Sequence, residues 1–192
     1  MTFVLETVLV TVDAQGLPFI APFGLQAAGS GWLMTPFRPS PALENLRAVP
    51  FATACAVDDV RIFAGCVTGR REWPTVPADT IAGARLAAAT SHMELKLERF
   101  EDDALRPRLH FSLVHEAVHG VWRGYNRARA AVIEGALLVA RLDLIERARV
   151  EREMAWLAKA VEKTGGAAER EAWNWLAGAV EDYCRQALSE AR

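Results

Sequence analysis

The sequence predicts an α+β protein in which a β-rich part precedes a helical part. Strand-like segments with alternating or β-branched apolar residues fill roughly the first 120 residues. The character changes at Gly124, after which the chain contains no proline and is rich in helix formers. Strands first and helices afterwards favour a barrel with a helical appendage over an alternating α/β fold. We therefore expect two domains, residues 1–123 and residues 124–192.

The first strands are expected at residues 5–12 and 17–25, on either side of a turn that ends at Gly16. Pro18 and Pro22 cannot donate hydrogen bonds to a sheet, so part of the second strand should lie at an edge or a bulge. Further strands are expected at 32–35, 51–57, 61–68, 92–100 and 108–121. In 92–100, apolar residues such as Met93 alternate with charged residues such as Glu94, which predicts a half-exposed strand.

Helices are expected at residues 41–47, 125–148, 150–163 and 168–190. Ser40 is a favourable N-cap residue for the first of them, and Pro41 suits its first helical position. Two glycines, Gly165 and Gly166, are a typical stop between the last two helices.

Composition excludes several classes of protein. The net charge of −2 argues against a dedicated nucleic-acid binder, which would usually be basic. Three cysteines without a C-x-x-C pair indicate a reducing compartment, and we expect a cytoplasmic protein without a disulfide framework. Glu6 interrupts the N-terminal apolar run, so we expect no signal peptide. The sequence contains no uninterrupted apolar stretch of about 20 residues, so we expect no membrane span.

The segment from Thr35 to Leu46 is a candidate anion site. Arg38 offers a permanent cation with a planar set of donors. The helix expected to begin after Ser40 would add free backbone N–H groups and the positive end of its dipole. The simpler interpretation is a strand-to-helix connection with a solvated arginine.

His115-Glu116-Ala117-Val118-His119 matches the H-E-x-x-H pattern of zinc peptidases. That chemistry needs a helix, which places both imidazoles on one face. Here the preceding residues 109–114 have β character, and on a strand positions four apart lie about 13 Å from each other. We therefore expect no metal site, and a zinc hydrolase acting through His115, Glu116 and His119 is the least favoured hypothesis.

Short motifs along the chain occur in the order found in one known family. In the first part they are Glu6-Thr7-Val8, Asp13 to Gly16, Ile20 to Gly24, Pro36-Phe37 and Asn45-Leu46. In the second part they are Tyr125 to Ala128, Ile133-Glu134, Ala140 to Leu142, Glu162 to Gly166 and Glu171 to Trp173. As a set they resemble a family of unknown function from methanogenic archaea, methylotrophs and planctomycetes, which belongs to the flavin-reductase-like FMN-binding split-barrel proteins.

The resemblance implies a split β-barrel with about three C-terminal helices, a homodimer, and FMN at the dimer interface. It implies that Phe23 and Gly24 lie near the flavin ring. The residues implied around the ribityl phosphate are Thr35, Phe37, Arg38, Ser40 and Asn45. Asn126 and Arg127 are further candidates for cofactor contacts, with a purely structural role at a helix start as the alternative.

The resemblance also implies an oxidoreductase that passes hydride or electrons between a nicotinamide or deazaflavin donor and an acceptor, with a link to tetrahydromethanopterin-dependent one-carbon metabolism. No residue is assigned a catalytic role, because flavin itself carries the electrons. The family often has a threonine where this chain has Ala42. That difference motivates the alternative of a non-catalytic split-barrel dimer that has lost flavin and binds another ligand or partner.

Overall fold

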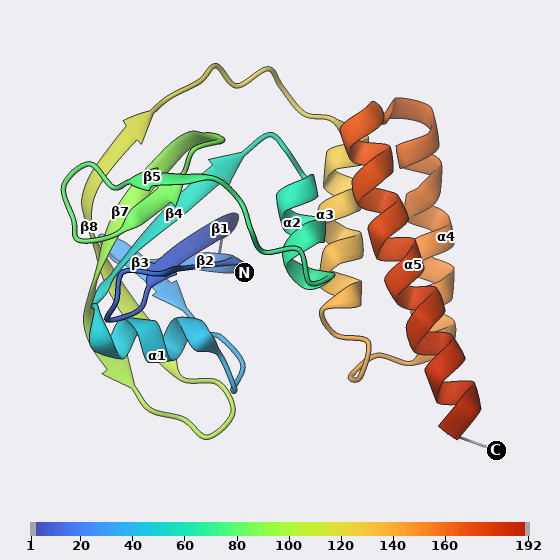
Figure 1. Cartoon of the computed structure of the whole chain (residues 1–192), viewed down its shortest axis with the longest axis horizontal. Coiled ribbons are helices and arrows are strands. Elements are labelled where there is room, and N and C mark those ends of the chain that lie inside the picture. Colours follow the sequence, from blue (N-terminus) through green and yellow to red (C-terminus); the bar gives the residue numbers. More distant parts are fainter. Residues whose placement is uncertain (1–2, 191–192) are drawn as a thin grey trace. The chain divides into compact units, whose positions relative to one another are not determined.

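The computed structural model describes residues 3–190, and their contacts divide the chain into two compact units (Figure 1). The barrel unit comprises the residues up to Asp58 and residues 72–122. The helical unit comprises residues 59–71 and the residues from Arg123 onward. The division into domains 1–123 and 124–192 stays a prediction, to which the packing adds that residues 59–71 belong with the helices.

Six antiparallel strands close the barrel in the order β1-β2-β3-β8-β7-β4 (Figure 1). Their bounds are β1 Val4–Val12, β2 Pro18–Ala28, β3 Gly31–Met34, β4 Phe51–Val57, β7 Ala89–Glu101 and β8 Arg108–Val118. The short strands β5 (Thr75–Pro77) and β6 (Ala84–Leu86) form a separate two-stranded sheet. The strands predicted at 5–12, 17–25, 32–35, 51–57, 92–100 and within 108–121 are therefore confirmed.

Within residues 3–190, β2 pairs with two neighbouring strands only near its C-terminal end. Residues 18–26 pair with β1, whereas β3 pairs with residues 26–28. Pro18 and Pro22 therefore lie where β2 has one described partner strand, as the missing N–H groups of proline require.

The barrel interior is an apolar core built from alternate residues of the strands. Helix α1 (Pro41–Ala48) adds Leu43 and Leu46 to it. The other buried members of this core are Leu9, Leu25, Met34, Ala52, Ala54, Leu95, Leu109 and Phe111. The buried face of α1 explains why the helix predicted at 41–47 forms although it is short.

The prediction of a strand at 61–68 is wrong, because residues Arg61–Val67 form helix α2. The segment is apolar and buried at five consecutive positions from Ile62 to Cys66. A short apolar run that is buried on all sides carries no period that distinguishes a helix from a strand. Asp59 lies two residues before the helix, and its carboxylate accepts a hydrogen bond from the Arg61 N–H at 3.1 Å.

Three long helices complete the helical unit: α3 (Arg127–Val139), α4 (Arg147–Thr164) and α5 (Ala167–Glu190). They confirm the number of predicted C-terminal helices, although the helix predicted at 125–148 ends at Val139. Helix α2 packs against α3 and α5. Gly135 of α3 allows α5 to approach closely, because a Cβ there would lie 2.9 Å from the Trp173 ring.

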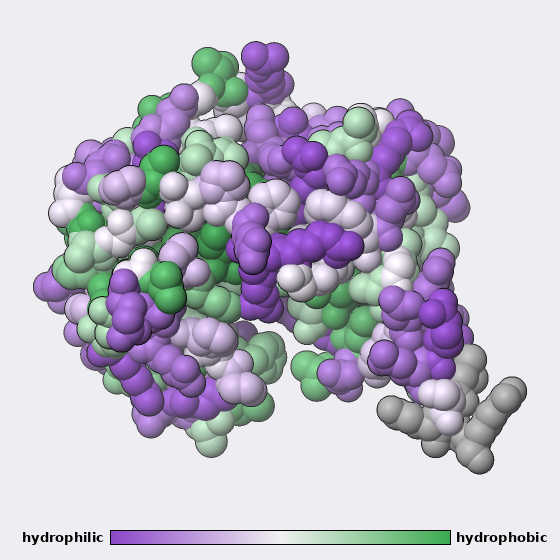
Figure 2. Space-filling model, in the orientation of Figure 1, coloured by the Kyte–Doolittle hydropathy of each residue, from purple (hydrophilic) through white to green (hydrophobic). Residues whose placement is uncertain are grey.

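Figure 2 shows hydrophilic side chains spread over the visible face of both units. Among the described residues, no helix combines the length and the apolar content that a membrane crossing needs.

Candidate functional site

The predicted anion site lies in the turn between β3 and α1. Thr35 is half-buried there, and both its carbonyl oxygen and its hydroxyl accept hydrogen bonds from Arg106 Nη2, each at 3.2 Å. The same guanidinium covers the exposed ring of Phe37, with its carbon 4.5 Å from the ring centroid. Arg106 therefore holds the turn against the segment between β7 and β8.

Arg38 is bound to that same segment. Its Nε donates to the Asp103 carbonyl oxygen at 2.9 Å, and its Nη2 pairs with the Asp102 carboxylate. Arg38, Arg47, Asp102 and Asp103 line an open hollow of about 560 Å³. Hydrogen bonds from the backbone N–H groups of Arg106 and Leu105 lower the pKa of Asp103, which favours its charged form. The hollow therefore contains two cations and two carboxylates.

Ser40 occupies the predicted N-cap position of α1, but its hydroxyl caps no backbone N–H. Its carbonyl oxygen accepts a hydrogen bond from the Leu43 N–H at 3.0 Å, and Pro41 occupies the first turn as predicted. The Ser40 hydroxyl thus remains available at the helix start. The Nδ2 of Asn45 donates to Thr11 Oγ1 of β1 at 3.1 Å, and the predicted place of Asn45 beside the phosphate stays a prediction.

Phe23 and Gly24 lie in β2, and both contact β1. The Thr7 hydroxyl donates to the Phe23 carbonyl oxygen at 3.0 Å. A Cβ at Gly24 would lie 2.9 Å from Val4 Cγ1, so the neighbouring strand by itself explains this glycine. The role of both residues near a flavin ring stays a prediction.

Asn126 and Arg127 belong to the helical unit. The Asn126 side-chain oxygen accepts hydrogen bonds from the N–H groups of Ala128 (2.8 Å) and Arg129 (3.1 Å), and its Nδ2 donates to the Thr164 carbonyl oxygen. Asn126 is therefore the N-cap of α3. This cap accounts for the residue structurally, and its predicted contact with a cofactor stays a prediction, as does that of Arg127.

The structural premise of the zinc-peptidase motif is wrong, because His115 and Glu116 lie in strand β8 and not in a helix. His119 follows that strand and approaches His92 of β7, with Nε2 2.9 Å from His92 Nδ1. The H-E-x-x-H pattern therefore does not place two imidazoles on one face of a helix.

The donors around the turn fit a phosphate in their chemistry. Arg38, Arg47 and Arg106 supply guanidinium groups, which match phosphate oxygens, and Ser40 supplies a hydroxyl that caps nothing. The start of α1 adds the positive end of a helix dipole. A phosphate would compete with Asp102 for Arg38.

Sequence reasoning did not identify Arg47, Arg106 or the acidic pair at 102–103 as neighbours of Arg38. Arg47 lies two turns along the predicted helix, and its basic character was the available signal. The loop residues are more than 60 positions away from Arg38, and no local pattern connects them.

Comparisons with known proteins agree with this architecture. The family model described as "Protein of unknown function (DUF447) N-terminal domain" matches residues 5–120, and the model "Protein of unknown function (DUF447)" matches residues 126–178. An FMN-bound protein from Methanosarcina mazei, assigned to the same model, has a similar crystal structure, with a TM-score of 0.79 at 17% identity over 92% of this chain and 94% of that one. No curated protein sequence matches the chain.

Two further solved structures are similar to part of the chain. They are the 2-nitrobenzoate 2-nitroreductase of Pseudomonas fluorescens (TM-score 0.51, 17% identity, 59% of this chain and 64% of that one) and an NADH:FAD oxidoreductase of Streptomyces globisporus (TM-score 0.50, 12% identity, 64% and 86%). The predicted fold class is confirmed: the chain is a flavin-reductase-like split barrel with C-terminal helices.

Proposed function

The chain belongs to the DUF447 family, and from that premise we propose that it is a flavoprotein that binds FMN through the turn between β3 and α1. The observation that carries the proposal is the FMN-bound relative, whose fold extends over nearly the whole length of both chains. The phosphate-compatible donors around Arg38 and Ser40 support it independently, since they lie where a β-strand leads into a helix.

In this proposal each group of residues has its own task. Arg38, Ser40 and Thr35 hold the phosphate together with the start of α1, and Phe37 offers an exposed apolar ring beside them. On the resemblance alone, Phe23 and Gly24 are assigned to the ring of the flavin and Asn45 to the ribityl phosphate. Asn126 and Arg127 are assigned to further contacts. Bound FMN supplies hydride and electron transfer, so the chain has to bind and orient it and needs no acid or base of its own.

We further propose an oxidoreductase that works as a homodimer, with a nicotinamide or deazaflavin as the electron donor. The fold supports this class of activity, since an NADH:FAD oxidoreductase shares it, but a shared fold alone establishes no substrate. The link to tetrahydromethanopterin-dependent one-carbon metabolism and the cytoplasmic location stay predictions.

Two observations favour a second function, a non-catalytic barrel that has lost flavin. Ala42 is only 1% exposed and has no hydroxyl to offer. The guanidinium of Arg38 is already engaged by Asp102 and by the Asp103 carbonyl oxygen. Either feature would weaken the binding of a phosphate.

The decisive experiment is an absorbance spectrum of the purified protein after addition of FMN and desalting. We expect a retained flavin band, lost in Arg38→Ala and kept in the control Arg99→Ala, which removes an exposed arginine of β7 that pairs with Glu101. Sedimentation of the loaded protein at the mass of a dimer would support the homodimer. Failure of the unmodified protein to retain FMN would place the non-catalytic function first.

A further inference from the structure

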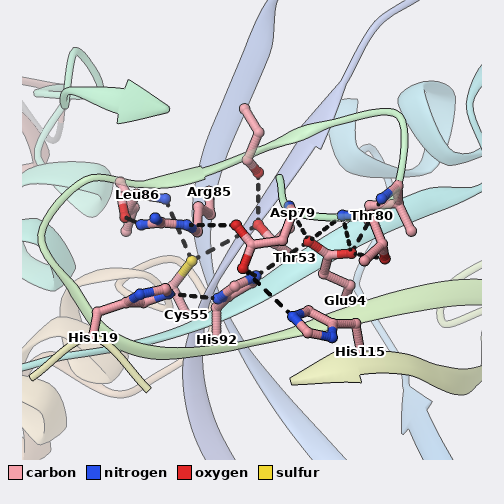
Figure 3. Close-up of polar contacts among 12 residues, drawn as sticks. Thr53, Cys55, Asp79, Thr80, Arg85, Leu86, His92, Glu94, His115 and His119 are labelled. Atoms are coloured by element: carbon pink, nitrogen blue, oxygen red, sulfur yellow. Dashed lines mark hydrogen bonds and ion pairs between the residues drawn. The ribbon is translucent and has the colours of Figure 1, made fainter. Parts of the chain in front are cut away.

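Three potential metal ligands meet on the outside of the barrel, apart from the proposed flavin site. Asp79 precedes β6, His92 lies in β7, and His119 follows β8 (Figure 3). One ligand atom from each residue lies within 4.8 Å of the others. His92 is buried, whereas Asp79 and His119 are exposed, so the group opens towards solvent.

Glu94, fully buried beside His92, determines which nitrogen of His92 carries the proton. Its carboxylate accepts hydrogen bonds from the N–H groups of Asp79, Thr80 and Ile81 and from the Thr80 hydroxyl. With its oxygens accepting on every side, Glu94 accepts from His92 Nε2 as well, at 3.2 Å. The proton of neutral His92 is therefore on Nε2, and Nδ1 accepts a hydrogen bond from His119 Nε2–H, 2.9 Å away. In this arrangement His119 Nε2 carries a proton, which a metal ion would displace.

This is the arrangement of a prepared metal ligand. Histidines that bind metals usually donate their other ring N–H to a carboxylate, which fixes the ring and its tautomer. We propose that Asp79, His92 and His119 form a binding site for a divalent transition-metal ion such as zinc. Two imidazoles and one carboxylate are a ligand set that zinc accepts, with a remaining position open to water or substrate.

Binding of a metal requires two changes at the exposed His119: the loss of the proton from Nε2 and a small movement of the ring. Two nitrogens bound to one zinc ion at about 2.0–2.1 Å in tetrahedral geometry lie roughly 3.3 Å apart. The His92–His119 separation must therefore widen by a few tenths of an ångström from its 2.9 Å. His119 can provide this movement, since it lies beyond the end of β8, whereas His92 is fixed by Glu94.

Both oxygens of the Asp79 carboxylate already face a nitrogen atom, and Oδ2 is the oxygen on the side of His92. Oδ1 faces Arg85 Nε at 3.6 Å, and Oδ2 faces His115 Nε2 at 3.5 Å and His92 Nε2 at 3.9 Å. Arg85 opposes a cation by Coulomb repulsion, so the affinity should be lower than that of a closed structural zinc site. The set differs from the H-E-x-x-H pattern, since it contains neither Glu116 nor His115.

Titration of tag-free, metal-stripped protein with Zn²⁺ in a calorimeter tests the site. We expect one ion per chain and at least a tenfold loss of affinity in His119→Gln and in Asp79→Asn. The matched control is His110→Gln, a β8 histidine that pairs with Glu101 outside the cluster, and it should bind as the unmodified protein does. Circular dichroism checks that each variant is folded.

Three results would overturn the site. They are the absence of stoichiometric binding, an equal loss in His110→Gln, and a loss in His115→Gln that His119→Gln does not share. A second measurement needs no variant: ¹⁵N NMR of the histidine side chains should find His92 protonated at Nε2 and a shift of its Nδ1 resonance on addition of Zn²⁺. A proton on Nδ1 of neutral His92 would contradict the proposed role of Glu94.

Discussion

Replacing Glu94 by leucine should leave five donors without their acceptor at once. The donors are the N–H groups of Asp79, Thr80 and Ile81, the Thr80 hydroxyl and His92 Nε2. A buried donor without a partner costs about 1–3 kcal/mol. The lower end applies here, because Asp79 and Thr80 are themselves exposed and water can reach part of the segment. Counting the three backbone donors alone at that end, we expect a loss of about 3 kcal/mol in the free energy of unfolding.

The measurement is urea denaturation followed by tryptophan fluorescence and by circular dichroism, with coincident curves required before a free energy is extracted. A loss of this size corresponds to a fall of about 6–12 °C in Tm. Glu94→Gln, which keeps one acceptor oxygen, should lie between Glu94→Leu and the unmodified protein. The matched control is Glu98→Leu in the same strand, whose side chain is 48% exposed and which should leave the midpoint unchanged. If Glu94→Leu loses no more than Glu98→Leu, the proposed clamp on the 79–81 segment contributes nothing to stability.

Further predictions concern single residues in both units. Gly31→Ala should destabilise the protein by at least about 2 kcal/mol in urea denaturation, because a Cβ there would lie 2.1 Å from a backbone oxygen of β8. Gly178→Ala in α5, where a Cβ meets nothing within 4 Å, should instead stabilise it by about 0.5–1 kcal/mol, and a loss would contradict the space seen there. Asn126→Ala should cost about 1 kcal/mol by removing the cap of α3, and an unchanged Tm would show that the cap is dispensable. Burial alone would raise the pKa of Asp59, but hydrogen bonds from Arg61 outweigh it and lower the pKa. Its stabilising contribution is therefore present above the ordinary value of 3.8 and disappears as the pH falls through the lowered pKa, so acid unfolding should be less steep in Asp59→Asn.

Most of the barrel could be predicted because its strands alternate and are separated by recognisable turns. The segment at 51–57 was placed at its observed bounds, and 5–12 and 92–100 differ from β1 and β7 by a few residues at the ends. The C-terminal helices followed from the lack of proline and the glycine stop. Local pattern was sufficient in these regions, because strand and helix periods differ clearly over such lengths.

A second kind of error, besides the helix at 61–67, arose where distant segments cover a residue. Alternation predicted Glu94 to be exposed, yet it is fully buried, since residues 79–81 close over it and donate to its carboxylate. The neighbours of His92 also come from distant segments, so a sequence-based search for metal ligands does not identify this residue. These partners are 13 or more positions away and on another segment, so no periodicity within 92–100 could reveal them.

The anion site stays a prediction, for which the sequence indicated the local features but not the ion pairs that the structure forms there. The position of Ser40 and Pro41 before a short helix is a local feature, and the structure has it. The ion pair between Arg38 and Asp102 joins two loops, and the loop with Asp102 lies between the strands predicted at 92–100 and 108–121. The sequence identifies the cation of such a site. The carboxylate that competes with a bound anion for this cation is determined by the fold.

The placement of α2 has a consequence for how the chain acquires its structure during synthesis. The ribosome produces Ile62, Phe63 and Cys66 long before the helices α3 and α5 against which α2 packs. Until those helices emerge, this apolar segment has no completed docking surface, although the strands on both sides of it can already pair. A fragment that stops at residue 123 would keep the segment permanently in that state. We therefore expect such a fragment to aggregate or to recruit chaperones, even though it contains every strand of the barrel.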